Sequence, residues 1–216
     1  MSKPSGAIDM TQGKPINLML RFALPMMIGS IFQSLYSMVD SAVLGRFVGS
    51  HALAAIGATT PTTGLILLLA TGVTSAISIV LSQYVGANDT DRVRKGIVAS
   101  GWITLLLGVV LGLISVFAAR PLMQLLKTPE DVIDMSVLYI QIVCGCGIAQ
   151  FAYNAAASIL RALGDSKTPL YFLILCSVLN VILDLISVIG LNMGVAGVAV
   201  ATVGSQAISA AICILV

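Results

Sequence analysis

Charged side chains are scarce in this sequence, because Asp, Glu, Lys and Arg together make up only 9% of its 216 residues. Soluble domains carry about 25% of such residues. Hydrophobic residues make up 58% of the chain, and its mean hydropathy is +1.04. A soluble core cannot hide so much apolar surface. The composition therefore predicts an integral membrane protein with several spans.

Residues that bind metals or phosphates are also few. The chain has a single histidine, His51, which is expected in a loop, and four cysteines that all lie inside apolar runs. Neither a structural zinc site nor a disulfide framework is therefore expected. No Gly-x-x-x-x-Gly-Lys sequence is present, which argues against a P-loop ATP site in this chain. We expect no cofactor and no nucleic-acid partner.

The apolar runs predict an all-α membrane protein, a bundle of six transmembrane helices. The expected spans cover residues 22–44, 59–83, 97–119, 137–160, 170–189 and 195–216. Residues 1–21 form a cytoplasmic or interfacial N-terminal segment, and residues 22–216 form one six-span lobe. Thr168 is the expected N-cap of the fifth span, with Pro169 as its first helical residue.

The basic residues indicate the orientation of the bundle, because short cytoplasmic loops are enriched in Lys and Arg. Eight of the eleven lie on the side of the N-terminus: Lys3, Lys14, Arg21, Arg92, Arg94, Lys95, Arg161 and Lys167. The other side has Arg46, Arg120 and Lys127. The N-terminus is therefore predicted to be cytoplasmic, with the bundle in the cell membrane.

Two features of the spans bear on helix shape and packing. Gly108 and Gly112 form a Gly-x-x-x-Gly pattern in the third span, which suits close contact between helices. Pro25 and Pro61 lie near the starts of the first two spans. A proline there either occupies the first turn without cost or kinks the helix, and the first-turn placement is the favoured interpretation.

Only two of the nine acidic residues, Asp40 and Asp184, fall within predicted spans. A carboxylate at membrane depth costs at least about 2.5–3.5 kcal/mol on insertion scales. No Lys or Arg lies well inside a span, so each acid must be protonated, hydrated or bound to a cation. Asn180 lies one helical turn from Asp184 on the same face. This arrangement predicts a site for a proton or a monovalent cation.

The predicted depths bring further oxygen atoms to the same layer. Tyr139 and Thr202 lie a few residues inside the spans that contain them, at about the depth of Asp40 and Asp184. Carboxylate, amide, hydroxyl and phenol oxygens suit a hard cation such as Na⁺. Other roles remain open: Tyr139 as an interfacial anchor, Thr202 as a packing hydroxyl, and Asp184 with Asn180 as a structural polar pair. Asp40 is interfacial if the first span ends early.

These residues resemble the N-terminal lobe of multidrug and toxic compound extrusion (MATE) transporters. The similarity lies in Leu24-Pro25, Gln33, Val39-Asp40, Gly45-Arg46, Gly49 and Leu53-Ala-Ala-Ile-Gly57 of the first span and its exit. It continues in Arg161-Ala-Leu-Gly-Asp165-Ser-Lys-Thr168-Pro169 and in Asn180-Val-Ile-Leu-Asp184. The resemblance implies an antiporter that exports organic, cationic, drug-like compounds in exchange for H⁺ or Na⁺. It places Asp40, Asn180, Asp184, Tyr139 and Thr202 where the family's N-lobe cation site is expected.

The length departs from the family pattern of about twelve spans in two lobes, so the chain is expected to need a second lobe. That lobe is either the rest of a longer chain or a homodimer partner. Expected partners are an organic substrate, a monovalent cation and membrane lipid. A lipid-linked precursor flippase of related fold is an alternative, although its cavity should hold several basic residues. A membrane-embedded aspartyl enzyme is another, because two adjoining carboxyls can share a proton.

Overall fold

The computed structural model describes residues 15–215 and is helical along nearly all of that length. Its helices are α1 (Pro15–Phe47), α2 (Ser50–Gly86), α3 (Thr90–Leu125), α4 (Glu130–Gly145), α5 (Ile148–Ala162), α6 (Lys167–Asp184) and α7 (Gly194–Leu215), with a π-helix, η1 (Leu185–Gly190), between α6 and α7. Five spans are long and apolar enough to cross a membrane, and α4 with α5 makes a sixth. The predicted all-helical bundle of six spans is confirmed.

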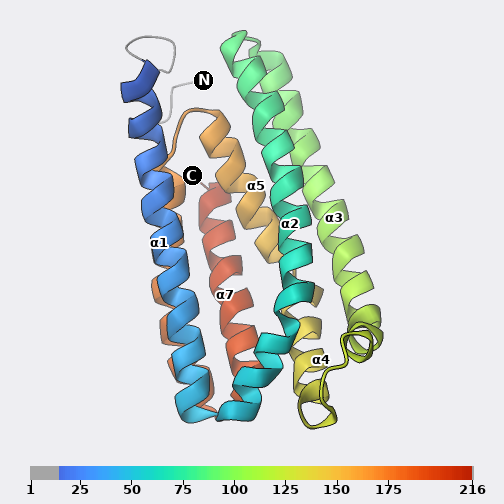
Figure 1. The fold of residues 1–216 in the computed structure, drawn as a ribbon. Helices are drawn as coiled ribbons and strands as arrows, with labels where there is room; N and C mark the ends of the chain where they lie inside the picture. Colours follow the sequence, from blue (N-terminus) through green and yellow to red (C-terminus); the bar gives the residue numbers. More distant parts are fainter. Residues whose placement is uncertain (1–14, 216) are drawn as a thin grey trace.

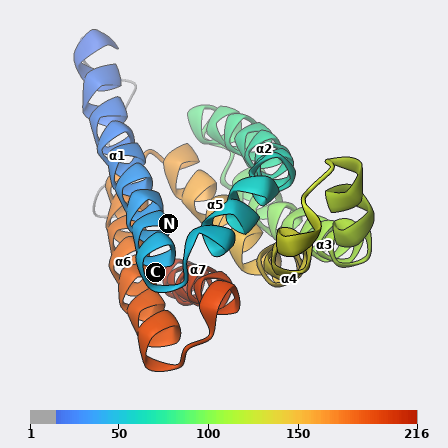
Figure 2. The ribbon, with the colours of Figure 1, turned by 60° about the horizontal axis from the view of Figure 1, so that its bottom comes forward.

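The helices form a bundle in which α7 is central (Figure 1). α7 packs against α4, α5 and α6, and α1 packs mainly along α6. α2 packs against α3, α4 and α5 on the other side of the bundle. Figure 2 shows α1 and α6 side by side at one edge and α3 and α4 at the opposite edge. Small buried residues on α7, Ala199 and Ala201, allow its neighbours to approach closely.

The fourth span is broken, whereas the sequence predicted one continuous helix over residues 137–160. α4 and α5 meet at Cys146 and Gly147 with a bend of 45°. A Cβ on Gly147 would lie 2.8 Å from the carbonyl oxygen of Cys144, so glycine is required at this turn. The amide of Gly147 donates to that same oxygen at 3.0 Å, which satisfies a carbonyl that a broken helix would otherwise leave free.

The Gly-x-x-x-Gly pattern of α3 packs directly against this break. A Cβ on Gly108 would lie 3.1 Å from the Cα of Ile148, and one on Gly112 would lie 3.0 Å from the carbonyl oxygen of Gly145. Both glycines are therefore in backbone-to-backbone contact with the start of α5 and the end of α4. Gln141 adds a hydrogen bond from its amide nitrogen to the carbonyl of Val116 at 3.3 Å.

Two local predictions about helix starts were wrong. α1 begins at Pro15 and α2 at Ser50, so Pro25 and Pro61 lie ten and eleven residues inside their helices rather than in the first turn. α2 bends within its first third (Figure 1), in the stretch that contains Pro61, as expected where a proline removes a backbone hydrogen bond. Because α2 begins at Ser50, His51 also belongs to a helix and not to a loop.

The predicted N-cap of the fifth span was also wrong. α6 begins at Lys167, one residue before Thr168, and Pro169 is its third residue. Ser166 is at the N-cap position and makes no capping bond with its side chain. The carboxylate of Asp165 caps the helix instead, accepting from the amides of Lys167 and Thr168 at 3.0 Å and from the Thr168 hydroxyl at 2.6 Å. Asp165 is only 2% exposed, so these bonds compensate a buried charge.

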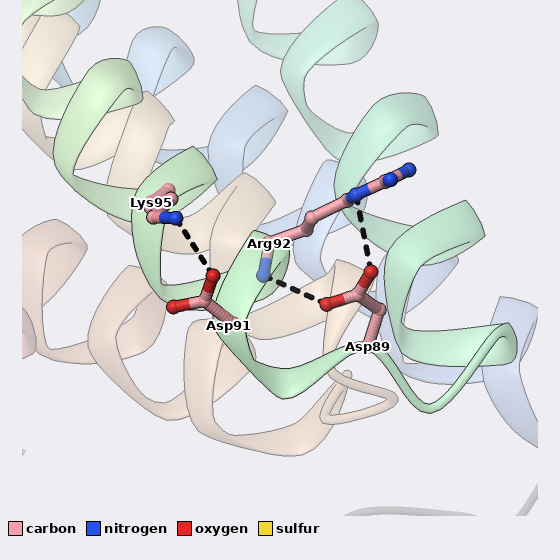
Figure 3. A network of polar contacts seen from close by, with 4 residues as sticks. All are labelled: Asp89, Asp91, Arg92 and Lys95. Carbon is pink, nitrogen blue, oxygen red and sulfur yellow. Dashed lines mark hydrogen bonds and ion pairs between the residues drawn. The ribbon is translucent and has the colours of Figure 1, made fainter.

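The described basic residues of the predicted cytoplasmic side lie at the end of the bundle where α3 and α6 begin; Lys3 and Lys14 lie outside the described residues. At the turn into α3, Asp89 pairs with Arg92 at 3.1 Å and Asp91 with Lys95 at 2.7 Å (Figure 3). Asp89 also caps α3 by accepting from the Arg92 amide at 3.0 Å. At the opposite end, α4 is tied to its neighbours by the pairs His51–Asp131 and Arg120–Asp134.

Candidate functional site: a buried acid pair between α1 and α6

α6 carries the most deeply buried polar residues of the site. Asp184 is 0% exposed and Asn180, one turn earlier, is 1% exposed. The apolar residues of α6 explain this orientation, because Val178 and Ile182 lie on the opposite, exposed face. The two carboxylate oxygens of Asp184 and both amide atoms of Asn180 have no hydrogen-bond partner within the described part of the chain. A buried polar atom without a partner is costly, so these atoms are available to a ligand.

Asp40 on α1 approaches Asp184 across the α1–α6 contact. The two carboxyl groups lie close enough to share a hydrogen bond when one of them is protonated. Oδ1 of Asp40 is buried and has no hydrogen-bond partner among the described residues. We call Asp40 and Asp184 the acid pair. Its members come from helices that are far apart in sequence and are brought together by the packing of α1 along α6.

The backbone changes from α-helical to π-helical directly after Asp184. η1 begins at Leu185, and the amide of Leu191 donates to the carbonyl of Ile186 at 2.9 Å, five residues back. η1 forms the end of this span, directly before the turn into α7. No pattern in the sequence predicts this π-helical turn, because no residue composition marks a π-helix.

Two tyrosines lie close to the acid pair. Tyr139 on α4 is within electrostatic range of Asp40 and Asp184, as the shared depth of these residues predicted. Tyr36 on α1 is within range of Asp40 and Tyr139, and sequence reasoning missed it. The signal was present, because Tyr36 precedes Asp40 by four residues and so lies on the same helical face.

Thr202 on α7 is placed differently from the other candidate residues. Its hydroxyl donates to the carbonyl of Val198 in its own helix at 2.9 Å. This is the usual arrangement of a threonine inside a membrane helix, and it leaves only the lone pairs of the oxygen for another partner. Among the described residues, no hydrogen bond joins Thr202 to the acid pair.

The arrangement offers oxygen ligands without a competing positive charge. No Lys or Arg of the described residues forms an ion pair with either member of the acid pair. Two adjoining carboxyls favour a shared proton or a bound hard cation, because either one removes the cost of two buried negative charges. Among residues 15–215 no group of three or more His, Cys, Asp or Glu side chains could hold a metal ion.

Comparison with known proteins gives consistent matches along the chain. A family model described as MatE matches residues 25–186. The chain is 35% identical over 205 residues to the probable multidrug resistance protein YpnP of Bacillus subtilis, covering 94% of this chain and 46% of the relative. The probable multidrug resistance protein YoeA of the same organism is 33% identical over 186 residues, covering 84% of this chain and 40% of the relative.

A solved structure gives the same result. A MOP superfamily transporter from Pyrococcus furiosus superposes with a TM-score of 0.91 and 27% identity, covering 99% of this chain and 47% of that chain. The chain therefore spans about half the length of the proteins it matches. The match extends over the helices that carry the acid pair.

Proposed function

Because the chain belongs to the MATE family of transporters, we propose that it forms one lobe of a secondary antiporter. The antiporter exports organic, cationic, drug-like compounds across the cell membrane in exchange for H⁺ or Na⁺. The relatives described above are named as drug-resistance proteins or transporters and not as enzymes. The ion, the substrate class and the cell-membrane location are parts of this proposal.

The observation that carries the proposal is the acid pair. An antiporter must bind its driving ion and its substrate in alternation, and a pair of buried carboxyls changes its net charge when it takes up the ion. Asn180 supplies an amide oxygen one turn from Asp184, and Tyr139 supplies a phenol at the same level. We assign the coupling-ion site to Asp40, Asp184 and Asn180, with Tyr139 as a further ligand and Thr202 as an outer one.

A polar surface on α1 supports the need for a second lobe. Ser30, Ser34, Ser37 and Ser41 recur at intervals of three or four residues, and each hydroxyl donates to a carbonyl of the preceding turn at 2.9–3.1 Å. All four serines are exposed, as is Gln33 on the same helix. A helix surface of this kind at membrane depth suits another protein surface or a water-filled path better than lipid. We propose that the second lobe, in the same chain or in a homodimer partner, faces this serine stripe.

The adjoining carboxyls would also meet the geometric requirement of an aspartyl enzyme. The two readings differ in what the protein does in a sealed membrane. The test is efflux of a fluorescent organic cation from proteoliposomes holding the complete transporter, with an imposed H⁺ or Na⁺ gradient. Antiport predicts efflux of the dye against its concentration gradient, and this efflux should stop when the ion gradient is dissipated. Efflux that ignores both ion gradients would exclude coupled antiport.

A further inference from the structure

A polar cavity lies near the other end of α1 and α6, where its chemistry is opposite to that of the acid pair. It has a volume of about 160 Å³, is partly open, and is lined by residues of α1, α5 and α6 and by Ser166, which precedes α6. Its lining includes Pro25 on α1 and Pro169 on α6, each fifteen residues before its member of the acid pair. At about 1.5 Å per residue, the two sites are on the order of 20 Å apart. We call this space the Arg161 cavity.

One permanent positive charge lines the Arg161 cavity. The half-buried side chain of Arg161 projects from the last turn of α5, and one of its nitrogens donates to the Ser158 hydroxyl at 3.0 Å. A guanidinium has five N–H donors, so most of its capacity is left over. No acidic residue is among the described lining residues, and no carboxylate of residues 15–215 pairs with Arg161.

Neutral hydrogen-bonding groups surround this charge. Tyr153 and Asn154 lie about two turns before Arg161 on α5 and line the same space, together with Gln33 of α1. Ser166 lines it from the start of α6 and is only 2% exposed, yet its hydroxyl has no hydrogen-bond partner among the described residues. An unpartnered buried hydroxyl in a polar cavity indicates that a partner is supplied from outside the chain.

Asp165, which directly precedes Ser166 in the sequence, is not among the residues that line the cavity. The carboxylate of Asp165 is occupied by the Lys167 and Thr168 amides and by the Thr168 hydroxyl.

The volume of the cavity limits the size of its ligand, because drug-sized ligands occupy pockets of about 300–1,000 Å³. The Arg161 cavity is smaller than that and suits one compact group.

We propose that the Arg161 cavity binds a single oxyanion, a phosphate or carboxylate group, held by the Arg161 guanidinium with the Ser166 hydroxyl as a second donor. Planar guanidinium groups bind such oxyanions through two parallel hydrogen bonds. The group is presented either by an anionic lipid headgroup or by a soluble anion. This site is separate from the acid pair, and its test does not depend on ion-coupled export.

The test measures ligand-dependent thermal stabilisation of the purified, delipidated protein. The probes are phosphatidylglycerol, the zwitterionic phosphatidylcholine and inorganic phosphate. The variants are Arg161→Gln, Ser166→Ala and, as a matched control, Arg94→Gln, which removes an exposed arginine from the same end of the bundle. Apparent affinities come from the shift in melting temperature as each probe is titrated.

We expect phosphatidylglycerol to stabilise the wild type, with an apparent affinity about ten- to a hundredfold weaker in Arg161→Gln and unchanged in Arg94→Gln. Stabilisation by phosphatidylglycerol alone identifies a lipid source, and equal, Arg161-dependent stabilisation by inorganic phosphate identifies a soluble one. Binding that is the same in wild type and Arg161→Gln overturns the proposal.

Ser166→Ala keeps the test decisive if Arg161→Gln does not fold. Its hydroxyl makes no bond within the described chain, so removing it should leave the melting temperature of the ligand-free protein unchanged or slightly raised. Under the proposal, anion affinity nevertheless falls by at least about threefold, because a donor to the anion is lost. Unchanged affinity in this variant, with Arg161→Lys also binding like the wild type, would refute the oxyanion site.

Discussion

Replacing Asp184 by asparagine tests the acid pair most directly. Asp184→Asn keeps the shape and the hydrogen-bonding capacity of the side chain but removes a carboxylate that is 0% exposed and has no partner among the described residues. The folded yield should therefore match or exceed that of the wild type, since a charge at membrane depth costs at least about 2.5–3.5 kcal/mol. Ion-driven export should nevertheless be lost or strongly reduced.

The size of the loss follows from the number of charges that the site carries. Each elementary charge that moves through a membrane potential of about 100 mV contributes about 2.3 kcal/mol. Because about 1.36 kcal/mol corresponds to a factor of ten, one lost charge lowers the attainable substrate gradient by about fiftyfold at 100 mV. Asp40→Asn should behave nearly the same, as it removes the other member of the pair.

The assay is ion-driven dye efflux from proteoliposomes at matched protein content, with the complete transporter. Asp134→Asn is the control, because Asp134 is an exposed acid near the start of α4 that pairs with Arg120 of α3, and its loss should leave coupling intact. Asn180→Ala should weaken apparent ion affinity more than substrate affinity. Near-normal coupling in Asp184→Asn, together with low folded yield in Asn180→Ala, would show that the pair is structural and would refute the ion-site reasoning.

Three further predictions follow from the packing and the orientation. Gly112→Leu should lower thermal stability by at least about 1–3 kcal/mol, since even a Cβ would lie 3.0 Å from a backbone oxygen at the α4–α5 break. A melting temperature equal to that of the wild type would contradict this packing. Asp165→Ala should lower thermal stability by about 1–3 kcal/mol, because the start of α6 loses its cap. The control is Asp91→Ala, which removes an exposed ion pair and should change thermal stability little. In a cysteine-free background, Ala87→Cys should react with impermeant thiol reagents only from the cytoplasmic side and Glu130→Cys only from outside, and the reverse pattern would invert the predicted topology.

The sequence was sufficient to predict the spans and the members of the acid pair, because long apolar runs and carboxylates within such runs are both rare in proteins. Long apolar runs indicate membrane spans. A carboxylate such as Asp184 inside a span has a high free-energy cost of insertion, so it indicates a functional site. The proximity of Asp40 and Asp184 could be predicted from their matching depth. Their contact through the packing of α1 along α6 could not, because neither helix carries a pairing signal in its own sequence.

Other features were hidden because their residues are ordinary in a membrane chain. Tyr36 looks like any aromatic residue in a span, although it lies one turn from Asp40. Gly145 and Gly147 look like the many other glycines of this chain, yet they lie on either side of Cys146 where α4 ends and the chain turns into α5. The sequence predicted Thr168 as the cap of α6 because it precedes a proline. In the structure Asp165 caps this helix instead, since its carboxylate accepts three hydrogen bonds at the helix start.

The packing of α1 along α6 has a consequence for the synthesis of the protein. α1 ends at Phe47 and its main partner ends at Asp184, so a further 137 residues must be made before that contact can be complete. At about 5–20 residues per second, translation of that stretch takes roughly 7–27 s. During this interval the hydroxyls of Ser30, Ser34, Ser37 and Ser41 are satisfied by the backbone of α1 itself. α1 can therefore remain in the bilayer as a single helix until its partner has been made.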